Sequence, residues 1–135
     1  MSVQLLKVQP EGVYHCSLLY ELLKERTPEQ SISHKEMPTY TQHCQFVSSE
    51  PYRAWYLVQD DSITVGATYL TRNGEIGIAV FEEQRGKGYA EAAIKMLMER
   101  HDGPFLANIN PKNGASIGLF RKLGFEILQE TYSHE

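Results

Sequence analysis

The sequence predicts a mixed α/β fold, in which helices flank a central, mostly antiparallel sheet and the elements follow the order βααβββαβαβ. Three observations lead to this fold class. Residues 52–80 hold three strand-like runs separated by short turns, as in an antiparallel meander. A loop of glycines and cations at 85–88 then opens an amphipathic helix. After that helix, strand and helix patterns alternate up to residue 131, which favours a crossover to a parallel strand.

The N-terminal part of the chain predicts one strand and two helices. Residues 3–8 alternate weakly between apolar and polar side chains and form the first strand. Pro10 ends this strand and can begin a helix, whose apolar residues recur at helical spacing up to Arg26. Residues 38–47 then form a shorter helix, with Thr39 as its N-cap.

The middle of the chain predicts a three-stranded meander. Residues 52–59 are rich in aromatic and β-branched side chains, and Asp60-Asp61 turns the chain into a second strand over 62–71. Asn73-Gly74 indicates a type I′ hairpin turn, because this turn needs positive φ at both central residues. Residues 75–80 then return antiparallel to the second strand.

The last third of the chain alternates helix and strand. Residues 90–100 form the best-defined helix, with apolar side chains along one face. A short apolar strand follows at 105–109, and residues 113–123 form a last helix that Gly124 ends. Residues 125–131 complete the expected order as a strand.

Length and composition favour one domain, which we take as 1–135. The formal net charge is −4 and no long basic run exists, which argues against a general nucleic-acid binder. No apolar run approaches the ~20 residues of a membrane span, and the first residues do not resemble a secretion signal. We therefore expect a cytoplasmic protein that binds neither nucleic acid nor membrane, with Cys16 and Cys44 reduced. The five histidines lack metal-ligand spacing, so we expect no metal.

The loop after the third meander strand has the composition of a phosphate site. Gly86 and Gly88 let the backbone approach an anion closely, and Arg85 and Lys87 add positive charge. The first amides of a helix lack intrahelical partners and lie at the positive end of its dipole. We therefore expect residues 85–90 to bind a pyrophosphate; the alternative is a purely structural strand–helix turn.

Two motifs resemble those of the GNAT superfamily of N-acetyltransferases. The first is Arg85-Gly86-Lys87-Gly88-Tyr89-Ala90, which is similar to the acyl-CoA signature Arg/Gln-x-x-Gly-x-Gly/Ala. The second runs from Asn113 to Phe125 and is similar to the Asn-x-x-Ala/Ser helix that ends in Lys-x-Gly-Phe. The resemblance covers residues 52–130 well, and residues 1–50 only by the order of the elements.

The resemblance implies acetyl-CoA as the acyl donor and a primary amine as the acceptor. It implies that backbone amides hold the pyrophosphate, that the edge of the preceding strand bonds the pantetheine arm, and that Phe120 flanks the thioester. The amine would attack the thioester carbonyl directly, with a backbone amide near Val80 polarising that carbonyl. The implied cofactor-binding residues are Ile78, Ala79, Val80, Arg85, Gly86, Lys87, Gly88, Tyr89, Ala90, Asn113 and Phe120. The alternative role of Asn113 is a helix N-cap and that of Phe120 is core packing, and either role is compatible with ligand contact.

Two features depart from the family pattern. Many members carry a tyrosine where this chain has Phe120, and that hydroxyl protonates the departing thiolate. Tyr69, Tyr132 or water would substitute here, or no acid is needed, because coenzyme A is already a fairly good leaving group. The family usually ends in two strands after the last helix, whereas only 11 residues follow Gly124. One edge of the acceptor site is therefore expected to be open or completed by a second subunit in a homodimer.

The expected catalytic residues are Glu75 and His43. Glu75 opens the strand that leads to the glycine loop, where a carboxylate can take the proton of the amine, directly or through water. Its alternative role is that of a solvated hairpin residue. His34 and His43 lie in the segment that covers the acceptor in this family, where an imidazole is a base or a substrate contact; a surface histidine is the alternative for each. Five aromatic residues are candidates for the acceptor pocket, about half of which strand alternation turns elsewhere: Tyr40, Tyr52, Trp55, Tyr56 and Tyr69.

The acceptor itself has three interpretations. We favour a small-molecule amine of the amino-sugar or amino-acid type, because small GNAT-like domains with the Ser-x-x-Leu-Phe-x-Lys-Leu-Gly-Phe ending often act on such amines. A protein or peptide N-acetyltransferase is the first alternative, although the acidic residues that would form its groove are scattered. A non-catalytic acyl-CoA-binding module is the second, suggested by Phe120 and the short C-terminal segment.

Overall fold

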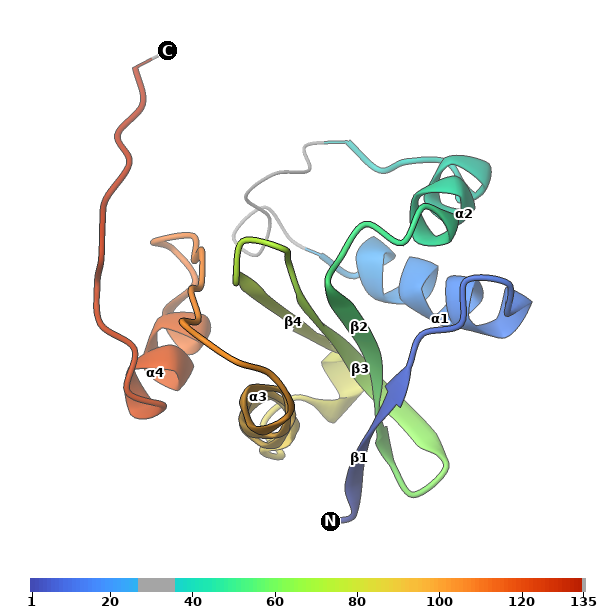
Figure 1. Cartoon of the computed structure of the whole chain (residues 1–135), viewed down its shortest axis with the longest axis horizontal. Coiled ribbons are helices and arrows are strands. Elements are labelled where there is room, and N and C mark those ends of the chain that lie inside the picture. The colour runs from blue at the N-terminus through green and yellow to red at the C-terminus, as the bar shows by residue number, and fades with distance from the viewer. Residues whose placement is uncertain (27–35, 135) are drawn as a thin grey trace.

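The computed structural model describes residues 1–26 and 36–134. A four-stranded antiparallel sheet in the order β1-β2-β3-β4 forms its centre. Helices α1 and α2 cover one face of the sheet, and α3 lies against the other face with α4 beside it (Figure 1). The predicted fold class is confirmed. The elements are β1 (Val3–Lys7), α1 (Val13–Lys24), α2 (Tyr40–Ser48), β2 (Ala54–Asp60), β3 (Ile63–Leu70), β4 (Ile76–Val80), the short 3-10 helix η1 (Glu82–Gln84), α3 (Tyr89–Arg100) and α4 (Gly114–Lys122).

Local sequence signals explain where helices α2 and α4 begin. Thr39 caps α2 as predicted, because its Oγ1 accepts from the Gln42 amide at 3.1 Å while the Gln42 side chain accepts from the Thr39 amide at 2.9 Å. Asn113 begins α4 in the same way, and its side chain accepts from the Ser116 amide at 3.1 Å. Both caps satisfy backbone donors that the first helical turn leaves unpaired.

The hairpin between β3 and β4 differs from the predicted type I′ turn. Gly74 has φ of +85°, but Asn73 does not have positive φ. The Gly74 amide donates to the Thr71 carbonyl at 3.0 Å, and the Thr71 amide donates to the Glu75 carbonyl at 2.9 Å. These bonds close a three-residue loop that needs a left-handed residue only at its last position, which glycine supplies without strain.

Two hydrophobic clusters hold the helices to the sheet. On the α3 side, Ile94 and Leu97 are fully buried and pack with Phe120 of α4. On the α1–α2 side, Val47 of α2 packs with Leu57 of β2, together with leucines of α1. Burying a large aliphatic side chain contributes roughly 1.5–3 kcal/mol, so these clusters fix the helices relative to the sheet.

The two strands predicted after α3 are not formed, which corrects the expected element order. Residues 105–109 make only one bridge to the sheet, between Glu75 and Leu106 in parallel orientation. Residues 125–131 form no strand; there Ile127 is 69% exposed and Leu128 77% exposed. Apolar β-type sequence becomes a strand only where a neighbouring edge supplies hydrogen bonds, and neither segment lies along such an edge beyond Leu106.

Because neither segment pairs along it beyond Leu106, strand β4 has a free edge among the described residues. The Ile76 amide donates to the Leu106 carbonyl at 2.8 Å, so the backbone groups of Ile76 face away from β3. Because these directions alternate along an antiparallel strand, the backbone groups of Ile78 and Val80 face the free edge as well, and those of Ala79 face β3.

Candidate active site

A cleft of about 820 Å³ opens along the free edge of β4. Its loop end is lined by the loop that follows β4 and by α4, which lies on the α3 side of the sheet. Its aromatic end, defined by Phe46, Tyr52, Trp55 and Tyr69, lies under α1 and α2. Because Tyr69 pairs with Gly77 near the start of β4, the strand connects the two ends.

The loop end presents unpaired backbone donors. Gly86 and Gly88 have φ of +77° and +85°, and Gly88 is the N-cap of α3. Along the described chain, no backbone carbonyl accepts a hydrogen bond from the amides of residues 86–91. These amides lie at the positive end of the α3 dipole, which makes the loop end chemically suited to an anionic group such as a phosphate.

Five of the six predicted loop residues line the cleft, and Lys87 does not. Arg85, Gly86, Gly88, Tyr89 and Ala90 all line the cleft. The Nε of Arg85 donates to the Val80 carbonyl at 3.2 Å, which holds the guanidinium beside the end of β4.

The polar groups of two loop side chains are bonded to other side chains. Lys87 is exposed and its Nζ donates to Gln84 Oε1 at 3.1 Å. The Tyr89 hydroxyl donates to the Asp60 carboxylate, and this bond raises the pKa of Tyr89 and lowers that of Asp60. Tyr89 therefore offers the cleft its backbone rather than its hydroxyl.

Helix α4 forms the opposite wall of the loop end. Asn113 and Phe120, both predicted from the second motif, line the cleft. Asn113 has the capping role described above, which leaves its amide nitrogen as the group available to a ligand. Phe120 is only 4% exposed and meets Phe125 edge-on, with ring centroids 5.0 Å apart.

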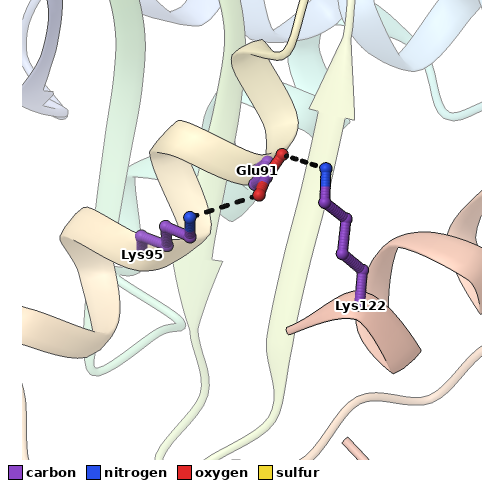
Figure 2. Close-up of polar contacts among 3 residues, drawn as sticks. All are labelled: Glu91, Lys95 and Lys122. Carbon is purple, nitrogen blue, oxygen red and sulfur yellow. Dashed lines mark hydrogen bonds and ion pairs between the residues drawn. The ribbon is translucent and has the colours of Figure 1, made fainter. Parts of the chain in front are cut away.

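An ion-pair network joins α3 to α4 at this wall. Glu91 lies between Lys95 on its own helix, at 3.2 Å, and Lys122 of α4, at 3.1 Å (Figure 2). The hydrogen bond from Lys122, followed by that from Lys95, lowers the pKa of Glu91. Glu91 and Lys122 also line the cleft, so the network fixes the two helices on either side of it.

Glu75 lies in the cleft where β4 separates from residues 106–110. The residue as a whole is half-buried, and Asn108 Nδ2 donates to Glu75 Oε2 at 2.6 Å in an exposed hydrogen bond. Its backbone is fixed as well, because its amide donates to Thr71 Oγ1 at 3.0 Å. The residue is therefore held by its neighbours and not a freely solvated hairpin residue.

His43 lies in the same cleft but is more deeply buried, at 5% exposure. Burial lowers its pKa, partly offset by a hydrogen bond with the backbone of Cys16, so the imidazole is neutral near pH 7. Its Nε2 has no hydrogen-bond partner in the described parts of the chain. His34, the other histidine predicted for this region, lies outside the described residues.

The aromatic end is a rigid cluster of rings. Tyr52 and Tyr69 stack with centroids 4.0 Å apart and planes 4° apart, and Trp55 meets Tyr52 edge-on at 4.7 Å. Phe46 of α2 lies 5.8 Å from Tyr52, also edge-on. A Cβ on Gly77 would come within 2.0 Å of the Tyr69 ring, so glycine at this position allows the ring to lie over β4.

The other two aromatic candidates lie elsewhere. Tyr56 faces α3, where its hydroxyl is 2.8 Å from His101 Nε2, and Tyr40 packs edge-on against Tyr20. Phe46 and Asn108 also line the cleft and were not predicted from the sequence. Phe46 carried only a helical periodicity, and Asn108 belonged to a predicted strand, so neither had a signal that pointed to the cleft.

Within the described ranges, no helix has the length and apolar character that crossing a membrane requires. The same residues contain no group of three or more His, Cys, Asp or Glu side chains arranged to hold a metal ion. The candidate site is thus a cleft with a backbone-lined anion site, a carboxylate, an imidazole and an aromatic wall.

Comparison with known proteins identifies the family model that matches this chain. The model of the acetyltransferase (GNAT) family matches residues 17–125. No curated protein matches the chain significantly. A GNAT superfamily phosphinothricin acetyltransferase from Sinorhizobium meliloti, in complex with AcCoA, has a TM-score of 0.78 and 22% identity over 96% of this chain and 77% of that one.

Two further solved structures have a similar fold. A ribosomal-protein-alanine N-acetyltransferase from Brucella melitensis has a TM-score of 0.72 and 19% identity, over 93% of this chain and 85% of that one. Mutant forms of the spermidine/spermine N-acetyltransferase SpeG from Vibrio cholerae have a TM-score of 0.69 and 16% identity, over 93% and 80%. These likenesses show the fold, and the acceptors in the three names differ, so the fold does not select an acceptor.

Proposed function

We propose, since this chain belongs to the acetyltransferase (GNAT) family, that it transfers the acetyl group of acetyl-CoA to the primary amine of a small molecule. One observation carries the proposal. A single cleft joins the unpaired amides of residues 86–91 to a carboxylate and an aromatic wall, along a strand edge that has no neighbour among the described residues over most of its length. The protein would act as a single domain over 1–135.

The donor would occupy the loop end and the β4 edge. The amides of residues 86–90 would bind its pyrophosphate, with Arg85 and Lys87 supplying positive charge. The outward backbone groups of Ile78 and Val80 would form hydrogen bonds with the pantetheine arm, as an added strand does. Ala79, whose backbone groups face β3, would lie between them beside the arm. Asn113 and Phe120 line the opposite wall, which supports their contact with the same arm.

Glu75 would act as the general base and His43 as a second proton acceptor or acceptor contact. The amine nitrogen, once deprotonated, attacks the thioester carbonyl carbon, the C–S bond breaks, and the thiolate leaves with a proton from water or a hydroxyl. Phe120 has no hydroxyl to give. Tyr69 lines the cleft, whereas Tyr132 is 87% exposed and its hydroxyl donates to Glu130, so Tyr69 or water is the acid that we favour.

Two further proposals concern the cellular location of the protein and its oligomeric state. We place the protein in the cytoplasm, since Cys16 and Cys44 lie on the neighbouring helices α1 and α2 and are both free thiols. We also propose a homodimer, because the segment after α4 extends away from the domain (Figure 1). Three large apolar side chains of this segment, Ile127, Leu128 and Tyr132, are exposed. Sedimentation of the full chain tests the assembly.

The test of the function is a calorimetric titration with acetyl-CoA, followed by free-thiol release on the same sample across a panel of amines. The panel includes amino sugars, amino acids, polyamines and peptides. Binding with amine-dependent release from small amines is the expected result. Preferred release with peptides would favour a protein acetyltransferase, and binding without any release would favour a non-catalytic acyl-CoA-binding module. Absence of acetyl-CoA binding would overturn the proposal.

A further inference from the structure

We infer that the acceptor carries its primary amine on a flat apolar group, such as an aromatic ring, which stacks at the aromatic end of the cleft. This inference rests on the proposed acetyltransferase function and narrows its acceptor class. It disfavours amino sugars and polyamines, which are otherwise compatible with the same fold.

The aromatic side chains of this end do not form part of the hydrophobic core. Phe46, Tyr52 and Tyr69 belong to neither hydrophobic cluster, and Trp55 only borders the α1–α2 cluster. Phe46 is 40% exposed and the other three are half-buried, although all four line the cleft. Contiguous aromatic surface that is left open in a cleft marks a binding site for an apolar group.

Contacts within the cluster hold the four rings in fixed positions before any ligand binds. Each ring meets at least one other in the cluster, in a stacked or edge-on geometry that aromatic pairs prefer. The backbone beneath Tyr69 is glycine, and any larger residue would displace the ring. A ligand ring therefore meets a fixed surface, and little side-chain entropy is lost when it binds.

The remaining lining near this end mixes apolar and polar side chains, which are Leu19, Leu22 and Leu23 of α1 together with Arg26, Glu36, Gln42 and His43. Where a sugar lies against the rings and the leucines, its hydroxyl groups have no partner, and each buried hydroxyl without a partner costs roughly 1–3 kcal/mol. An aromatic ring would lose no hydrogen bonds there.

Charge argues against a polyamine. The carboxylates that line this end, among the described residues, are Glu36 and Glu75, and Arg26 adds a positive charge. Glu75 already accepts a hydrogen bond from Asn108. An acceptor with one amine suits this balance better than one with three or four cationic nitrogens.

The geometry also orients the amine. Gly77, over which the Tyr69 ring lies, is two residues from Glu75, so a ring stacked at the aromatic end places a short aminoalkyl chain near this carboxylate. The ammonium gives one proton to Glu75, and the nitrogen forms a bond to the thioester carbonyl carbon. The C–S bond breaks, and the second proton lost by the nitrogen passes to the departing thiolate through water or Tyr69. The buried Nε2 of His43, which has no hydrogen-bond partner among the described residues, can form one hydrogen bond with a polar substituent of the acceptor.

Trp55 is the single tryptophan of the chain, so its fluorescence reports on the aromatic end without requiring acetyl-CoA. We expect a saturable fluorescence change with phenethylamine, and none with glucosamine or spermidine at the same concentrations. Thiol release should show a kcat/KM for phenethylamine at least about tenfold above the other two, the range that burial of a few methylene equivalents supplies.

Two variants make the test specific. Phe46→Ala removes an exposed ring from α2 and should raise the KM and Kd for phenethylamine several-fold while acetyl-CoA affinity is unchanged. Tyr14→Ala removes a ring that is 77% exposed on α1, outside the cleft, and should change neither.

The failures of the two proposals are distinguishable. Acetyl-CoA binding with faster release from glucosamine or spermidine than from phenethylamine would overturn the inference and leave the acetyltransferase function standing. Failure to bind acetyl-CoA would overturn the function, and phenethylamine binding by fluorescence would then still decide whether the aromatic end takes a flat apolar group. A Phe46→Ala effect equal to that of Tyr14→Ala would count against the inference.

Discussion

The two ends of the cleft differ in the atoms that form them, which are mainly backbone atoms at the loop end and side-chain atoms at the aromatic end. The loop end consists mainly of backbone amides from one continuous stretch, residues 86–91, whose direction is set by the start of α3. The aromatic end consists of side chains that come from α2, from β2 and the residues before it, and from β3. A site made of backbone depends on conformation, whereas a site made of side chains depends on the identity of residues far apart in the sequence.

This difference explains how one fold can serve several acceptors. Substituting a ring at the aromatic end would change the surface where we place the acceptor and would leave the sheet and the glycine loop in place. Substituting a glycine in the loop end changes the backbone on which the donor would depend. The loop end therefore suits a donor shared by a family, and the aromatic end suits an acceptor particular to one chain.

The largest expected effect comes from Gly88→Glu at the loop end. Gly88 has φ of +85°, and the new side chain would put negative charge where we place the pyrophosphate. We expect acetyl-CoA affinity, measured by calorimetry, to fall at least roughly 100-fold, because charge-assisted hydrogen bonds contribute ~1.5–3 kcal/mol each.

Backbone strain needs its own control at this position. Gly88→Asn adds a neutral side chain that tolerates the left-handed region better than most residues. It should retain most of the affinity, and circular dichroism should show both variants folded. A folded Gly88→Glu protein with unchanged affinity would refute the assignment of the loop end as the pyrophosphate site.

The next effect separates chemistry from binding. Glu75→Gln keeps the shape of the side chain and an oxygen that can accept from Asn108, but removes the proton acceptor. We expect kcat to fall by ~10²–10⁴ while acetyl-CoA affinity stays the same, as for loss of a general base. If kcat changes less than about tenfold, the base is elsewhere, and His43→Gln is then the variant to measure.

The contrast between the two ends also describes what the sequence could predict. The glycine loop, its position between β4 and α3, and the capping roles of Thr39 and Asn113 are local features, and local features leave local signals. The aromatic end depends on cross-strand neighbours such as Tyr69 and Gly77, whose register cannot be read from either segment alone. Asn108 reaches Glu75 only because the chain returns beside β4 at Leu106.

The strands predicted at 105–109 and 125–131 were wrong because strand formation also depends on contacts between distant segments. Both segments have apolar residues that fit a strand, but a strand also requires a partner edge, and sequence periodicity does not say whether one is present. The same missing pairing creates the free edge of β4. The wrong prediction and the position of the cleft thus have one cause.

A smaller effect is expected from the residue that holds Glu75. Asn108→Leu removes the donor at 2.6 Å and keeps a side chain of similar size. We expect kcat for the amine to fall about tenfold, since one hydrogen bond to a charged group contributes ~1.5–3 kcal/mol and water can replace part of it. Acetyl-CoA affinity should not change, because Asn108 lies at the Glu75 end of β4.

A purely structural role for Asn108 predicts a different pattern. Lower thermal stability with kcat unchanged would contradict positioning of Glu75. Asn108→Gln, which restores a donor on a longer side chain, should recover part of the lost kcat, and failure of this rescue would also argue against positioning.

The smallest effect concerns the network between α3 and α4, and it has a defined pH dependence. Lys122 and Lys95 lower the pKa of Glu91 from its ordinary value of 4.5, so the folded state favours the ionised carboxylate. The resulting stability is present above pH 4.5 and is lost as pH falls through the lowered pKa of the folded protein. Glu91→Gln should therefore lower Tm by at most a few degrees near neutral pH, less at high salt, and the difference from the unmodified protein should vanish at acidic pH.

Glu99→Gln is the matched control, because Glu99 lies on α3 without an ion pair among the described residues, and its effect should not follow this pH course. A Glu91→Gln difference that persists at acidic pH would mean that packing of the side chain, and not its charge, joins the two helices on either side of the loop end.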